Sequence, residues 1–146
     1  MAQKALGRLF NSSPAADNVW INLQDAGGVS FLCFLTGGAG DTYTLTQAQD
    51  ASGTGAKALA CITEYYTNTG NGSDAWTKRT QAVANTVVAA AAATQNAVAI
   101  EVLGVSLDDG FQFVRLASTG AGAVNAITSD LAVQRAPENL PAMATA

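Results

Sequence analysis

The stretch from Val29 to Thr63, VSFLCFLTGGAGDTYTLTQAQDASGTGAKALACIT, constrains the fold more than any other part of the sequence. An apolar run is followed by the glycine-rich segment Thr36–Gly40. Residues 42–46 then alternate, with Tyr43 and Leu45 on one side and threonines on the other. A period of two is typical of a strand with one buried face. The stretch therefore predicts two strands joined as a hairpin by a short, flexible bridge.

Further strands are predicted wherever apolar or alternating runs end in Gly, Asn, Asp or Ser. These runs are Val19–Leu23 and residues 58–67, 76–81, 97–107, 111–116 and 124–133. Residues 82–97 are ambiguous, because a run of alanines favours helix whereas the valines before it favour strand. We prefer strand, loop and strand there. Eight or nine short strands predict a single-domain all-β sandwich or barrel; the alternative is an α+β fold with one helix near residues 81–96.

The two ends of the chain differ from the part between them. Residues 1–18 carry three large apolar side chains before a break at Asn11–Pro14, and residues 134–146 contain two prolines that oppose regular pairing. We expect an N-terminal arm over residues 1–18, a β-domain over 19–133 and an extended C-terminal tail over 134–146. Whether each arm folds onto its own domain or reaches a partner is left open by the sequence.

Charge is scarce in this sequence. Charged residues make up 12% of the chain, about half the usual fraction of a globular domain. The formal net charge is −4, and Lys78-Arg79 is the only adjacent basic pair, so we expect no nucleic-acid partner. No apolar run approaches the roughly 20 residues of a membrane span, and the N-terminus lacks the apolar core of a signal peptide. We therefore expect no membrane partner, and synthesis in a cytoplasm.

Candidates for catalysis or metal binding are almost absent. The chain has no histidine, so neither a Ser-His-Asp nor a Cys-His arrangement can form. Asp108 and Asp109 are the only adjacent acids and are expected in a solvated turn. Cys33 and Cys61 lie in apolar runs and are expected to be small buried residues; pairing of their strands would allow a disulfide, but synthesis in a cytoplasm argues against one. We expect no enzyme, no cofactor and no metal site.

The aromatic residues Trp76, Tyr65 and Tyr66 admit two interpretations. Core or cross-strand packing is the expected role, because aromatic side chains bury large areas and stabilise neighbouring strands. The alternative is a carbohydrate-binding or host-surface-binding β-module in which these rings stack on sugars.

Four segments together resemble small virion proteins of tailed double-stranded DNA bacteriophages, encoded among the head genes. The segments are VWINLQD (19–25) with the following GGVSF pattern, TLTQAQDASGTGAK (44–57), AIEVLGVSLDDGFQFVRL (99–116) and DLAVQRAPENLP (130–141). They are patterns of strands and turns that extend over most of residues 19–141. The family offers no catalytic residues to carry over.

The resemblance implies a head decoration protein, also called a cement or minor capsid protein, bound to the capsid exterior of a virion assembled in the host cytoplasm. Its partner would be the major capsid protein, and symmetric placement would make it a homotrimer. Head–tail and tail components fit the same pattern. Apolar contacts to the capsid or to other subunits are expected from the two arms, at Leu6, Leu9, Phe10, Leu140 and Met143.

Overall fold

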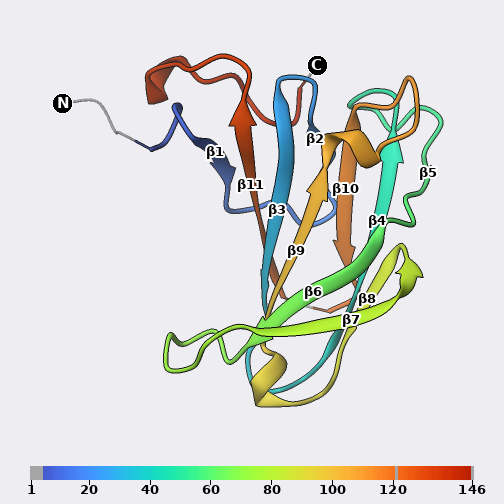
Figure 1. Ribbon diagram of the computed structural model, residues 1–146, viewed down its shortest axis with the longest axis vertical. Coiled ribbons are helices and arrows are strands. Elements are labelled where there is room, and N and C mark those ends of the chain that lie inside the picture. Colours follow the sequence, from blue (N-terminus) through green and yellow to red (C-terminus); the bar gives the residue numbers. More distant parts are fainter. Residues whose placement is uncertain (1–4, 121, 146) are drawn as a thin grey trace.

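The computed structural model describes residues 5–120 and 122–145 as two antiparallel sheets packed face to face (Figure 1). The larger sheet contains, in spatial order, β1 (Phe10–Ser13), β11 (Ala123–Leu131), β3 (Ala26–Phe34), β9 (Ala97–Leu103), β6 (Ile62–Asn68) and β7 (Thr77–Ala84). The smaller sheet contains β2 (Ile21–Asn22), β10 (Phe113–Ser118), β4 (Asp41–Ala48) and β5 (Lys57–Ala58), and β8 (Thr86–Ala89) also pairs with β4. The predicted all-β sandwich is confirmed, and the sheets do not close into a barrel.

The core lies between the inner faces of the two sheets. Along β4, Tyr43 and Leu45 are completely buried, as the alternation predicts. They belong to the same hydrophobic cluster as Phe31 of β3 and Ile100 of β9. Burying each large apolar side chain stabilises the fold by about 1.5–3 kcal/mol, so this cluster holds the two layers together.

The predicted hairpin between β3 and β4 is wrong. β3 pairs with β11 and β9, whereas β4 pairs with β10, β5 and β8 in the other sheet. The two strands face each other across the core, and the segment between them carries the chain from one layer to the other. This segment contains three residues with positive φ, Gly37, Gly38 and Gly40, a conformation that L side chains rarely adopt. The glycines therefore allow the chain to cross from one sheet to the other, in place of a tight hairpin turn.

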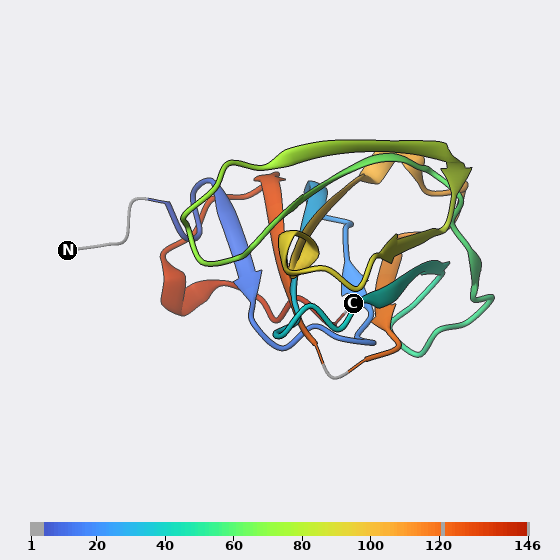
Figure 2. The ribbon, with the colours of Figure 1, turned by 90° about the horizontal axis from the view of Figure 1, so that it is seen from below.

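The middle of the chain also changes sheets. The single strand predicted for residues 58–67 is divided between β5 in the smaller sheet and β6 in the larger one. Over residues 82–97 the preferred strand–loop–strand prediction is confirmed, because β7 ends at Ala84, β8 follows, and the 3₁₀ turn η1 (Ala93–Gln95) leads into β9. The only helical piece there has three residues. Figure 2 shows β6 and β7 lying across one side of the molecule.

The N-terminal segment expected as an arm joins the domain from Phe10 onward. β1 pairs with β11, and Ala16 is completely buried. After the 3₁₀ turn η2 (Gly104–Ser106) and β10, the chain ends in β11, a third 3₁₀ turn η3 (Pro137–Asn139) and a tail. This tail returns to the smaller sheet, where the backbone N–H of Asn22 donates to the carbonyl of Met143 at 2.8 Å.

Candidate functional site

Three of the five residues expected to make intermolecular contacts lie together where the segment around Leu6 meets the C-terminal tail. Leu6, Leu140 and Met143 line a hollow of about 450 Å³ between the C-terminal tail and the strands β1 and β2. We call these three residues the terminal seam. Met143 also packs against the hydrophobic core, so part of the terminal seam stabilises its own domain.

The other two expected contact residues lie outside the terminal seam. Leu9 is 64% exposed in the turn before β1. Phe10 is half-buried and faces Ser129 across the β1–β11 pair. Of the five candidates, Leu9 is therefore the one whose side chain presents most of its apolar surface to a potential partner.

A second surface, which sequence reasoning missed, is the outer face of the larger sheet. Residues directly opposite each other in an antiparallel pair share a face. On this face Ala97 of β9 lies between Phe34 of β3 and Asn68 of β6. The small alanine leaves a hollow of about 370 Å³ that Trp76 also lines. The apolar run of β3 and the alternation of β9 were visible in the sequence, but the pairing of β9 with β6 was not.

The aromatic residues divide between the two sides of this sheet. Tyr65 is half-buried and packs on the core, and the next residue, Tyr66, is partly exposed on the outer face. Trp76 is 47% exposed, so it is not a core residue; packing against the neighbouring strand, the other part of the expectation, is not contradicted. It lies just before β7 and lines the hollow on the outer face together with Phe34 and Asn68.

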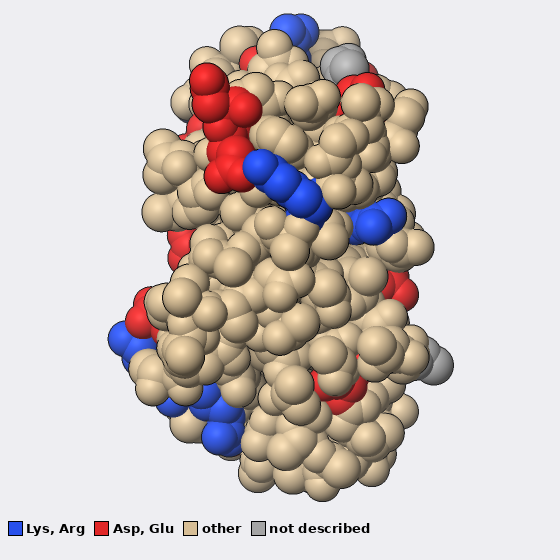
Figure 3. All heavy atoms as spheres, turned by 90° about the vertical axis from the view of Figure 1, so that its right-hand side faces the viewer, with Lys and Arg blue, Asp and Glu red and all other residues tan. Residues whose placement is uncertain are grey.

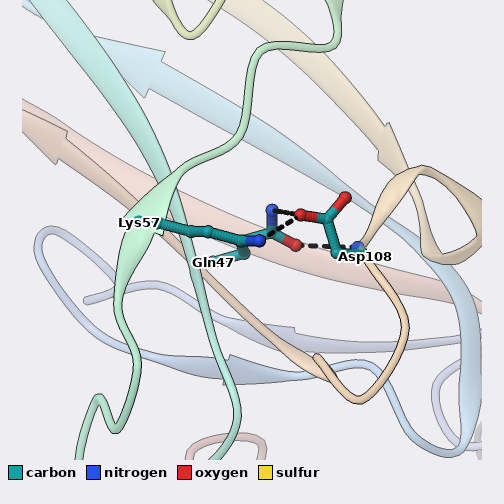
Figure 4. A network of polar contacts seen from close by, with 3 residues as sticks. All are labelled: Gln47, Lys57 and Asp108. Atoms are coloured by element: carbon teal, nitrogen blue, oxygen red, sulfur yellow. Dashed lines mark hydrogen bonds and ion pairs between the residues drawn. The ribbon is translucent and has the colours of Figure 1, made fainter.

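A polar network links β4, β5 and the turn before β10 near one end of β4 (Figure 4). Gln47 is almost completely buried, and its side chain exchanges two hydrogen bonds with Asp108, donating to Oδ2 at 3.0 Å and accepting from the backbone N–H at 2.9 Å. Lys57 of β5 reaches the same carboxylate at 2.5 Å. The hydrogen bond from Lys57 is the largest cause of a lowered pKa of Asp108. The expected solvated turn is confirmed, because Asp108 and Asp109 are both exposed, and the network clamps this turn to β4 and β5.

Charged side chains elsewhere are few and scattered. In the view of Figure 3, small groups of acidic and basic residues are separated by broad uncharged surface. Within residues 5–120 and 122–145, no three His, Cys, Asp or Glu side chains cluster as metal ligands would. Both cysteines are free, and burial raises the pKa of the Cys33 thiol. In the same described part of the chain, no helix is long and apolar enough to cross a membrane.

Comparison with protein-family models, curated proteins and solved structures finds no match to this chain. The fold and its surfaces define the class of protein: an all-β sandwich with exposed apolar side chains.

Proposed function

We propose that the protein is a virion component of a tailed double-stranded DNA bacteriophage that binds the outer surface of the capsid and stabilises the head. In this proposal it is a decoration protein whose partner is the major capsid protein. It acts by burying surface across joints between capsid subunits, and many copies add their modest binding energies. The resemblance of residues 19–141 to small phage head proteins suggests this role.

The structural observation that carries the proposal is the amount of apolar surface left in solvent. Large apolar side chains are exposed at Leu9, Phe34, Tyr66, Trp76, Val83, Val88, Leu103, Val105 and Val133. Singly exposed apolar residues are normal, but on a domain with only 12% charged residues few charges keep such a surface apart from its neighbours. A protein that works packed against neighbours tolerates such a surface.

Cryo-EM of purified virions tests the proposal directly. We expect density for the sandwich on the capsid exterior, in many copies arranged with the symmetry of the shell. A few copies at the head–tail junction or on the tail would instead support the other virion roles. Absence from purified particles would refute all of them.

The contact expected from Leu9 is tested by substitution. Leu9→Ser is expected to weaken binding of the purified protein to heads that lack it, because it removes an apolar contact without touching the core. Val105→Ser is the matched control, since Val105 is 90% exposed at a different turn. Binding of Leu9→Ser as tight as that of the wild type would exclude Leu9 from the contact.

Self-association belongs to the same proposal. Closed symmetry and placement at three-fold positions of the shell favour a homotrimer. Light scattering coupled to size-exclusion chromatography of the purified protein is expected to give three times the 14.8 kDa chain mass. A monomer mass even at high protein concentration would contradict a trimer in solution, and any three-fold arrangement would then exist only on the assembled shell.

A further inference from the structure

The hollow on the outer face of the larger sheet is shallow and open to solvent. Its floor is Ala97, and its sides include Leu32 and Phe34 from β3 and Trp76 from the segment before β7. Figure 1 shows β6 and β7 crossing β3 and β9 steeply at this end of the sheet. We call the site the aromatic hollow; its volume of about 370 Å³ lies within the usual range for small-molecule sites.

The loop that delivers Trp76 is held by its own hydrogen bonds. The backbone N–H of Gly70 donates to Oδ1 of Asn68 at 2.8 Å, and the hydroxyl of Thr69 donates to the carboxylate of Asp74. Gly70 has a φ of +79° and lies so close to Phe34 that a Cβ there would be 2.5 Å from the ring. The two aromatic sides of the hollow are thus preorganised, which lowers the entropic cost of binding a ligand between them.

Two side-chain amides line the aromatic hollow with unused hydrogen-bonding groups. Asn68 is 7% exposed and accepts a hydrogen bond through Oδ1, and among the described residues its amide NH₂ has no acceptor. Asn125 donates from Nδ2 to the carbonyl of Leu32 at 3.1 Å, and in the same residues its Oδ1 has no donor. The site therefore offers a donor pair and an acceptor beside aromatic rings.

This combination selects one class of ligand. An apolar side chain from a protein partner would cover both amides without pairing them, which costs free energy for each buried group. A sugar hydroxyl both donates and accepts, and the apolar face of a pyranose ring can stack on an indole. None of the residues that line the hollow is charged, so nothing there would balance the charge of an acidic sugar.

We propose that the aromatic hollow is a binding site for a neutral hexopyranose unit, which stacks on Trp76 and exchanges hydrogen bonds with Asn68 and Asn125. This proposal keeps the sugar-stacking role that the sequence suggested for Trp76. Tyr65 has no part in it, because its side chain packs on the core. The proposal does not rest on the capsid role, because the site lies on a single domain and needs no shell.

Titration of the purified full-length chain with neutral oligosaccharides tests the site. The probes are oligomers of glucose, galactose, mannose and N-acetylglucosamine, followed by indole fluorescence and by NMR. At least one series is expected to bind, and Trp76→Ala is expected to weaken that binding by at least about tenfold, the usual effect of removing an aromatic anchor. Asn68→Asp is expected to weaken it too, because it keeps the acceptor for Gly70 but removes the donor pair.

Control variants separate lost binding from lost folding. Val105→Ala removes an exposed side chain outside the aromatic hollow and is expected to bind like the wild type. All variants are compared by thermal unfolding, and Trp76→Ala and Val105→Ala are expected to retain the wild-type melting temperature within a few degrees. Asn68→Asp places a charge in a buried position and is scored only if its NMR spectrum shows the folded domain. Failure of every neutral series to bind, unchanged binding in Trp76→Ala, or preference for an apolar peptide at this site would overturn the proposal.

Discussion

Replacing Tyr43 with phenylalanine is expected to stabilise the protein. Tyr43 is the largest fully buried side chain, and within the described residues its hydroxyl has no hydrogen-bond partner. An unpaired buried polar group costs about 1–3 kcal/mol of stability. Phenylalanine keeps the ring in place and removes only the oxygen, and the small gap that remains offsets part of the gain. We therefore expect the free energy of unfolding to rise by about 1 kcal/mol.

Urea unfolding followed by indole fluorescence measures this difference. The midpoint is expected to rise at an unchanged m-value, and the melting temperature to rise by about 2–4 °C for a chain of this size. Tyr66→Phe is the matched control, because the partly exposed Tyr66 hydroxyl lies on the outer face and its removal should change little. A Tyr43→Phe variant that is less stable than the wild type would refute the reasoning, since the hydroxyl would then have a favourable partner.

The stability difference between Tyr43→Phe and the wild type is also expected to depend on pH. Burial is the largest cause of a raised pKa of Tyr43, and the nearby Cys33 and Asp41 raise it further. In the unfolded chain a tyrosine ionises near pH 10, so above that pH the unfolded wild type gains a charge that the folded state resists. The wild type must then lose stability as pH rises. The advantage of Tyr43→Phe is expected to widen above about pH 10 and to stay constant below about pH 9.

Three further predictions concern other parts of the chain. Iodoacetamide is expected to label half-buried Cys61 before Cys33, which should react only on unfolding; mass spectrometry after timed quenching checks the order, and equal rates would contradict it. Gly53→Ala is expected to cost more stability, by about 1 kcal/mol, than Gly110→Ala, because both glycines have positive φ but only at Gly53 would a Cβ meet an indole ring, at 2.9 Å. Asp108→Asn is expected to be less stable than the wild type at pH 7. Because the pKa of Asp108 is lowered in the folded state, the stabilisation by its carboxylate is lost as pH falls, and the free energies of unfolding of the two proteins should become equal below about pH 4. A constant gap in urea unfolding across that range would contradict this role of the carboxylate.

Sequence periodicity predicted which side chains point inward but not which strands pair. The alternation around Tyr43 and Leu45 correctly identified the buried face of β4. It also placed β3 and β4 in one hairpin, because nearby strands usually pair and a glycine-rich bridge permits a turn. Strand partners depend on contacts between distant segments, and a period of two carries no information about them.

The functional surfaces were harder to predict for the same reason. Trp76 was visible as an aromatic residue, but its exposure follows from the position of the preceding loop against Phe34. The clamp at Asp108 joins residues 61 positions apart in sequence, and no local pattern marks Gln47 as its partner. The fold brings together three of the five contact residues expected in the two arms, Leu6, Leu140 and Met143, because β1 and the C-terminal tail lie side by side.

The position of β11 between β1 and β3 affects how the protein is made. Phe10 lies opposite Ser129, so β1 cannot pair until β11 has left the ribosome. Until then β1 and β3 have no shared neighbour, and contacts so distant in sequence form slowly. The larger sheet therefore forms only once β11 has been synthesised, and a chain that lacks β11 would expose unpaired edges of β1 and β3 to aggregation.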